Sequence, residues 1–202
     1  MLTHEGRFRE ALHELGIAQR LEPTSSAILT TRALALGLSG QKEQSSAMLN
    51  DAIALESEGS YRNSATMHGV MGELSLLQPR NIPRFLAENA LAADLRRDRE
   101  AVKRWEAATQ TYRVHGETAM WQALLAMETS RSGTGTPTYA LARYQAELGA
   151  QADALQTLET LYARHDPRLI GLTIDPLLAR LRNQQRFVKI LAAMGLPKTD
   201  AG

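Results

Sequence analysis

Apolar residues recur three, four and seven positions apart along most of the chain, which is the spacing of one face of an α-helix. The first clear example follows Gly6, where the small and apolar residues are Phe8, Ala11, Leu12, Leu15, Ala18 and Leu21. The strict alternation that marks half-buried β-strands is hard to find. The pattern therefore predicts an all-α protein.

This helical pattern repeats with a period of about 34 residues. The glycine and three of its apolar positions return one period later as Gly40, Leu49, Ala52 and Leu55. Near the end of the chain the same spacing returns as Gly149, Ala154, Leu155 and Leu158. Each glycine is expected to end a helix, because a residue with positive φ is often needed there. Helix, short turn and helix in this period are typical of the tetratricopeptide (TPR) repeat.

A second feature agrees with this period in the middle of the chain. "WEAATQTY" places Trp105, Ala108, Thr109 and Tyr112 at the spacing of the first-helix TPR signature W-x2-L-G-x2-Y. Gly116 is then the glycine expected at the turn between two helices. It lies close to one period before Gly149 and somewhat more than two periods after Gly40. Two periods leave about eight residues over, so we expect an insertion in the third repeat, at 56–64 or 78–84.

The period gives a map of the helices. Second helices of each pair are expected near residues 7–21, 42–56, 83–97, 117–130 and 151–164, and first helices near 26–38, 62–77, 98–115 and 137–148, with a flexible link at 130–137. Residues 1–166 would form a TPR-like right-handed α-α superhelix of about four to five helix pairs, and 167–202 a C-terminal capping segment of short helices and a tail.

The chain opens on a second helix, so the apolar stripe of 7–21 has no first helix before it. Stacked repeats bury such stripes on their neighbours. We therefore expect the chain to be the C-terminal part of a longer protein, or the stripe to be covered by a second copy in a homodimer.

Composition narrows the function classes. Lys and Arg number 23 against 22 Asp and Glu, so no strong basic field indicates nucleic acid or an anionic membrane. There is no cysteine, which excludes disulfides and thiolate sites. No apolar run approaches the roughly 18 residues of a membrane span, and the N-terminus lacks the apolar core of a signal peptide. We expect no membrane insertion by this segment and a cytoplasmic location, or a periplasmic one if a membrane span lies upstream.

From about Ser130 onward the sequence resembles the C-terminal end of CadC-like bacterial transcriptional regulators of the winged-helix, ToxR/OmpR type. The matching features are the Gly149 turn, "ALQTLETLYARHDP", the run ending in "IDP", then "LARLRNQQRF" and "MGLP". Ile170 and Gly171 stand where bulkier residues are usual. The resemblance implies TPR repeats behind a winged-helix DNA-binding domain, which is absent from this chain, so DNA would be bound only through that domain. Similar tails occur on TPR-bearing Ser/Thr kinases and adenylate cyclases.

One stretch, "ARHDPRLIGLTIDPLLARL", holds residues that could suggest catalysis or metal binding. His165, Asp166 and Asp175 lie close together in sequence but lack a metal-binding spacing. Asp is a preferred N-cap and proline is favoured at the first helical position. Asp166-Pro167 and Asp175-Pro176 therefore predict two helix starts. We expect no catalytic, cofactor-binding or metal-binding residues, and no enzyme activity.

Other short motifs receive similar interpretations. "GLSG" at 37–40 lies where a helix should end and is no nucleophile elbow, and "SGTGTP" lacks the lysine of a phosphate loop. The basic run 96–105 is interrupted by Asp98 and Glu100, so a solvated helix face is favoured over a nucleic-acid site.

The expected function is recognition of a protein or peptide partner on the concave face, which first helices line. The register places seven candidate partner-binding residues there: Thr30, Leu34, Glu73, Glu106, Gln110, Tyr139 and Arg143. The leading hypothesis is a sensor or interaction domain of a CadC-like regulator. The alternatives are the TPR tail of a signalling kinase or cyclase, and a stand-alone TPR adaptor.

Overall fold

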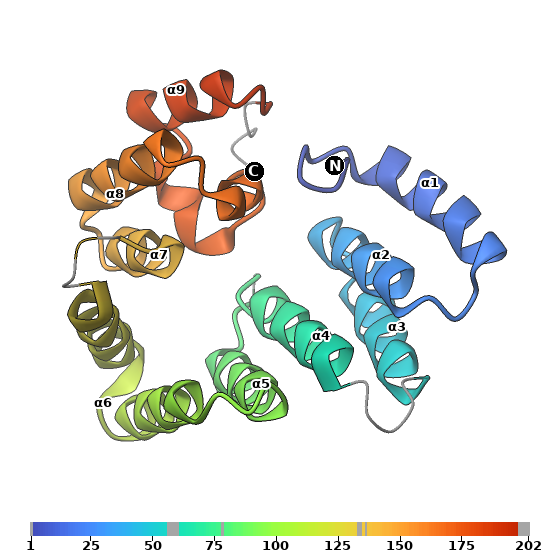
Figure 1. Ribbon diagram of the computed structural model, residues 1–202, viewed down its shortest axis with the longest axis horizontal. Coiled ribbons are helices and arrows are strands. Elements are labelled where there is room, and N and C mark those ends of the chain that lie inside the picture. The colour runs from blue at the N-terminus through green and yellow to red at the C-terminus, as the bar shows by residue number, and fades with distance from the viewer. Residues whose placement is uncertain (1, 56–60, 78, 133–134, 136, 198–202) are drawn as a thin grey trace. The chain divides into compact units, whose positions relative to one another are not determined.

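The structure is a computed structural model that describes residues 2–55, 61–77, 79–132, 135 and 137–197, and within these residues every regular element is a helix (Figure 1). The α-helices are α1 (Phe8–Leu21), α2 (Ser26–Leu38), α3 (Lys42–Ala54), α4 (Tyr61–Leu74), α5 (Ile82–Leu95), α6 (Arg99–Ser132), α7 (Tyr139–Glu147), α8 (Gln151–Ala163) and α9 (Gln185–Ala193). Two 3-10 helices, η1 (Pro167–Gly171) and η2 (Pro176–Leu181), precede α9. The predicted all-α class is confirmed.

The helix limits follow the predicted map closely. The expected helices at 26–38, 42–56 and 151–164 correspond to α2, α3 and α8, with similar ends. The short helices η1, η2 and α9 occupy the predicted capping segment. Part of the expected insertion at 56–64 and of the link at 130–137 lies outside the described residues, as does residue 78 of the other insertion candidate. The other insertion candidate, 78–84, contains the turn between α4 and α5, where the Asn81 N–H donates to the Ser75 carbonyl at 2.7 Å.

Glycines end helices at the predicted places. Gly116 has φ 82° and ψ −175°, so the continuous run α6 consists of two helices that meet at this residue. Gly40 and Gly149 have φ of 89° and 84°. Residues with a Cβ rarely adopt this conformation, which explains why glycine recurs at the ends of helices in this sequence.

The chain divides into two compact units. Unit 1 consists of Met1–Thr3 and Arg7–Thr109, and unit 2 of His4–Gly6 and Gln110–Gly202. This division falls inside α6, whereas the boundary expected from the sequence at residue 166 marks the end of the repeat period. Each unit has its own core.

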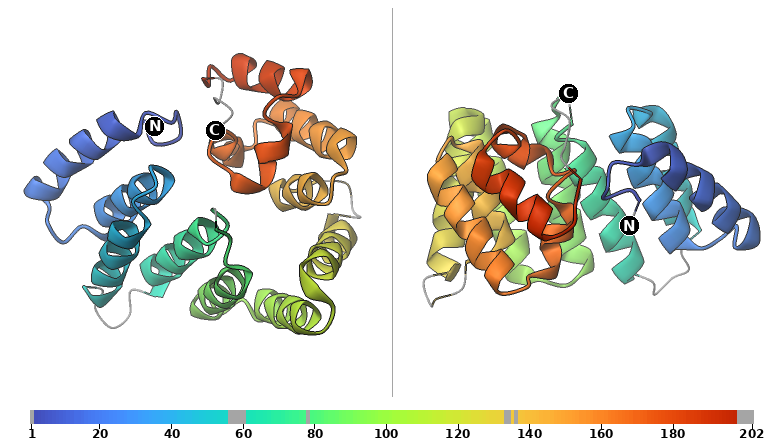
Figure 2. Two further views of the ribbon diagram at one scale, coloured as in Figure 1. Left: turned by 180° about the vertical axis from the view of Figure 1, so that it is seen from behind. Right: turned by 90° about the horizontal axis from the view of Figure 1, so that it is seen from above.

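In unit 1, α2 packs on α1 and α3, and α4 packs on α5 and also contacts α2 and α3 (Figure 2). The core between α2, α3 and α4 consists of Leu29, Ala33, Leu49, Ala52, Met67 and Met71. Its alanines let helix backbones approach closely. Next to α5, the Trp105 ring meets Phe85 edge-on, with ring centroids 5.4 Å apart. The half-buried Trp105 thus packs against α5.

In unit 2, α7 packs on α8, and the capping helices η1, η2 and α9 cover these two (Figure 1). The core is richer in leucine than that of unit 1 and includes Leu155, Leu158, Leu161, Leu172, Leu178 and Phe187. Trp121 lies beside Tyr144, with ring centroids 5.8 Å apart. The apolar residues that follow Gly149 in the repeat pattern are therefore among the residues that build this core.

Candidate functional site

The two Asp-Pro pairs both begin helices. Asp166 Oδ1 accepts a hydrogen bond from the Arg168 N–H at 2.9 Å, and Pro167 is the first residue of η1. Asp175 Oδ1 accepts from the Leu177 N–H at 2.9 Å, and Pro176 is the first residue of η2. The predicted N-caps are confirmed. His165 is exposed and has φ 55°, and it closes the turn after α8 by donating its N–H to the Tyr162 carbonyl at 2.9 Å.

The Asp166 cap also forms an ion pair. Both carboxylate oxygens of Asp166 accept from the Arg168 guanidinium, at 2.9 and 2.5 Å. The side-chain hydrogen bonds from Arg168 lower the pKa of Asp166, with a further contribution from the Arg168 N–H, while partial burial opposes the shift. The arrangement stabilises the charged cap at neutral pH.

Asp175 also contacts two of the predicted partner-binding residues, Tyr139 and Arg143. Its Oδ2 accepts from the Tyr139 hydroxyl at 2.9 Å and lies 2.8 Å from Arg143 Nε. The Asp175 side chain is only 7% exposed and that of Arg143 only 12%. Burial lowers the pKa of nearby Arg182, while attraction to the Asp175 carboxylate opposes that shift. We call this cluster of Tyr139, Arg143, Asp175 and Arg182 the cap cluster.

The cap cluster determines where Tyr139 and Arg143 act. They lie four residues apart on one face of α7, as the sequence predicts, and that face meets the chain's own capping segment at η2. A buried carboxylate is stable when its oxygens are all hydrogen-bonded or paired. Within this chain, the two side chains therefore hold the capping segment on α7.

The other predicted residues are distributed over both units. Thr30 donates its hydroxyl to the Ser26 carbonyl at 2.6 Å within α2, and Leu34 is half-buried on the same helix. Glu73 on α4 is also half-buried, and Glu106 and Gln110 on α6 are exposed. Unit 1 contains Thr30, Leu34, Glu73 and Glu106, and unit 2 contains Gln110, Tyr139 and Arg143.

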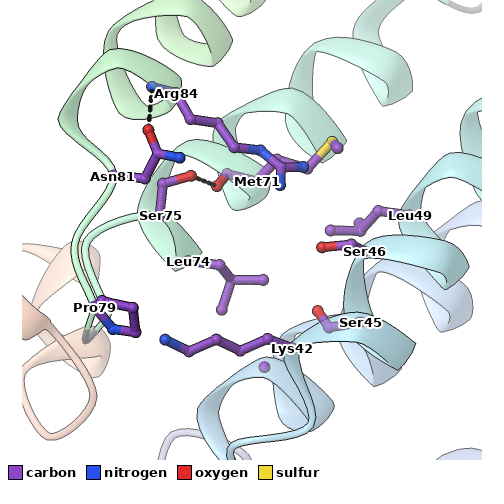
Figure 3. Close-up of a pocket in the computed structure, with 11 residues that line it drawn as sticks. Lys42, Ser45, Ser46, Leu49, Met71, Leu74, Ser75, Pro79, Asn81 and Arg84 are labelled. Carbon is purple, nitrogen blue, oxygen red and sulfur yellow. Dashed lines mark hydrogen bonds between the residues drawn. The ribbon is translucent and has the colours of Figure 1, made fainter.

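A partly enclosed hollow of unit 1 lies at one end of α3, α4 and α5, and no pattern in the sequence predicted it (Figure 3). Its volume is about 140 Å3. Apolar side chains of Leu49, Met71 and Leu74 form part of its wall, and the basic side chains are Lys42 from α3 and Arg84 from α5. We call it the Lys42–Arg84 pocket. Its lining residues come from two segments that are far apart in sequence, 37–49 and 71–84 without residue 78.

Several polar groups around this pocket form hydrogen bonds or ion pairs within the chain. Ser75 donates its hydroxyl to the Met71 carbonyl at 2.8 Å, and Asn81 Oδ1 caps α5 by accepting from the Arg84 N–H at 3.0 Å. Arg84 Nε lies 3.4 Å from Glu88 Oε1, while Glu88 Oε2 is 2.7 Å from His68 Nδ1. The Arg84 side chain is still 40% exposed.

Three of the lining residues, Gly37, Ser45 and Leu74, form a close helix contact. Gly37 is buried near the end of α2, and a Cβ at this position would lie 2.5 Å from Leu74 Cδ2 and 3.1 Å from Ser45 Oγ. Ser45 is itself buried and donates its hydroxyl to the Ala33 carbonyl at 2.6 Å. The predicted helix end in "GLSG" is confirmed at Gly40, whereas Gly37 lies inside α2 at its close contact with Leu74 and Ser45.

Among the described residues, no group of three or more His, Cys, Asp and Glu side chains is placed to hold a metal ion. The described helices also include none that is long and apolar enough to cross a membrane. Comparisons of the chain with protein-family models, with curated proteins and with solved structures found no match.

Proposed function

We propose that this chain is a TPR-like interaction module that binds a protein or peptide partner, as the C-terminal sensor part of a CadC-like transcriptional regulator. The observation that carries the proposal is the recurrence of helix, positive-φ glycine and helix at the TPR period. Gly6 and Gly40 are one period apart, Gly116 and Gly149 are nearly one period apart, and all four have positive φ. Partner binding on the inner face of stacked helix pairs would bias an attached effector domain.

The packing of each unit supports a repeat protein. Helix pairs α2–α3, α4–α5 and α7–α8 pack within each pair. Capping helices cover α7 and α8, as expected at the end of a repeat array, where the terminal face needs a covering. The DNA-binding or signalling domain itself lies outside this sequence in this proposal. A kinase or cyclase tail is the alternative with the same binding mode.

Affinity capture from a lysate of the source organism tests the proposal. Glu106 and Gln110 are exposed on the predicted binding face, so the double variant Glu106→Arg/Gln110→Arg should retain at least ten-fold less of any specific partner. Glu14→Arg is the matched control, because Glu14 is exposed on α1, a second helix in the repeat scheme. Equal retention by all three proteins, or no retained protein above an empty matrix, would contradict the proposal.

A stand-alone adaptor that forms a homodimer through α1 is the second candidate function. It is favoured by the exposure of two apolar residues on one face of α1, Ile17 at 36% and Leu21 at 78%. Sedimentation over a range of concentrations would detect the dimer, and Leu21→Glu should dissociate it. A chain that stays monomeric at all concentrations would exclude this candidate.

A further inference from the structure

The Lys42–Arg84 pocket has the size of a single amino-acid side chain. Pockets for drug-sized ligands and cofactors usually measure about 300–1,000 Å3, whereas this one measures about 140 Å3. At roughly 30 Å3 for each water molecule in the liquid, it has room for a few waters. Interface pockets of this kind receive anchor side chains of a partner, which contribute much of the binding energy.

The lining of the pocket selects the chemistry of that side chain. Leu49, Met71 and Leu74 offer an apolar surface that favours methylene groups. In Figure 3, Lys42 and Arg84 lie on opposite sides of Leu74, one from α3 and the other from α5. Two cationic side chains at the edges of an apolar surface favour an occupant with a short apolar stem and a negative end.

The Glu88 carboxylate near the pocket does not use all the hydrogen-bond donors of Arg84, so Arg84 can also bind a second carboxylate. Glu88 is shared between His68, at 2.7 Å, and Arg84, at the longer distance of 3.4 Å. A guanidinium has five N–H donors, and the Arg84 side chain remains 40% exposed. Arg84 can therefore keep Glu88 and also donate to a carboxylate that enters the pocket.

We propose that the Lys42–Arg84 pocket binds a glutamate side chain of the protein partner. The glutamate methylenes would contact Leu49, Met71 and Leu74, and its carboxylate would accept hydrogen bonds from Arg84, while Lys42 adds a second positive charge on the other side of Leu74. The inference rests on the proposed function, because a protein partner is what presents such a side chain. It adds a site whose lining includes none of the seven residues predicted from the repeat register.

The test is a titration of the whole chain with N-acetyl-glutamate N-methylamide, followed by NMR of backbone amides and methyl groups. This probe has no free terminus, so its side chain is its only charge. Saturable shifts are expected at Ser46, Leu49, Met71 and Leu74, and the uncharged glutamine analogue should bind at least ten-fold more weakly. Equal shifts with the glutamine analogue, or equally tight binding of inorganic phosphate at this position, would overturn the proposal.

Variants separate the pocket from general charge effects. Lys42→Gln/Arg84→Gln should weaken probe binding at least ten-fold. The control Arg9→Gln/Lys103→Gln removes two exposed positive charges from the same unit, and probe binding should not change. Unchanged binding in the pocket variant, with a native amide spectrum, would overturn the proposal.

The probe titration and the partner capture test the glutamate pocket and the interaction module separately. If the wild-type chain binds no probe but still captures a partner that Glu106→Arg/Gln110→Arg loses, the glutamate pocket is wrong and the interaction module stands. If the probe binds in the pocket but no partner is captured, the interaction module lacks support while the site exists. The two experiments therefore fail independently.

Discussion

The two ends of the described chain differ in how their terminal faces are covered. In unit 2, α7 and α8 are covered by η1, η2 and α9, and Leu158, Leu172 and Phe187 are completely buried. In unit 1, α1 packs on α2, but Ala11 is its one buried residue among those described, and Leu21 is 78% exposed. Both ends consist of amphipathic helices, so amphipathicity alone does not determine whether a terminal face is closed.

The two terminal faces differ in the polar contacts that attach the outermost helices to the rest of their unit. The capping segment of unit 2 is attached by apolar packing and also by the cap cluster, where a buried Asp175 binds Tyr139, Arg143 and the start of η2. Between α1 and α2, by contrast, Arg32 donates to the neutral side chain of Gln19. A buried and fully paired carboxylate fixes one geometry, because any shift leaves a charge without its partner.

The largest expected effect comes from removing that anchor. Asp175→Ala should lower the free energy of unfolding by about 3–5 kcal/mol, because it breaks the buried ion pair with Arg143 and removes an N-cap. Urea denaturation followed by circular dichroism measures the change.

Asp166→Ala is the matched control for this prediction. It removes the same type of cap, but its partner Arg168 is 55% exposed. The expected loss is about 0.5–2 kcal/mol. Equal losses for the two variants would mean that the cap cluster adds nothing beyond capping.

The second prediction concerns the close contact in unit 1. Gly37→Ala should destabilise by about 1–2 kcal/mol, because the new Cβ meets Leu74 and the buried Ser45, and this outweighs the better helix propensity of alanine. The same substitution at Gly16 on α1 should stabilise by about 0.5–1 kcal/mol, since its Cβ would meet nothing closer than Arg20 Nη1 at 4.0 Å. Thermal and urea unfolding of both variants measure the difference in sign. A stabilising Gly37→Ala would contradict the packing that we describe.

The smallest effect is a pH dependence at the start of η1. The hydrogen bonds from Arg168 lower the pKa of Asp166 in the folded chain. The stabilisation is therefore fully present above the unfolded value of about 3.9. It is lost as the pH falls through the lower folded pKa. Arg168→Gln should reduce this acid-induced loss, measured as the difference in urea midpoint between variant and wild type from pH 6 to pH 3.

Lys103→Gln is the control for the acid titration, because its exposed pair with Glu100 should leave the profile almost unchanged. Identical profiles for Arg168→Gln and the wild type would show that the ion pair does not contribute to stability.

The helices and their ends could be predicted from the sequence because the signals are local. Apolar spacing locates the helical faces, and Asp-Pro locates the starts of η1 and η2 at Asp166 and Asp175. Gly116 divides α6 because the backbone at that residue requires positive φ, which glycine adopts far more readily than other residues. Helical spacing also predicted that Tyr139 and Arg143, four residues apart, lie on the same side of α7.

What those side chains meet depends on contacts between distant parts of the chain, which no local pattern encodes. The sequence could not show that Asp175, far along the chain from Tyr139, would accept its hydroxyl, so it did not predict that Tyr139 and Arg143 bind the capping segment. The Lys42–Arg84 pocket likewise needs two turns brought together by helix packing. Helix formation and capping are determined by neighbours within about four residues. Burial, pairing of charges and pockets are determined by tertiary packing, and the structure alone decided them.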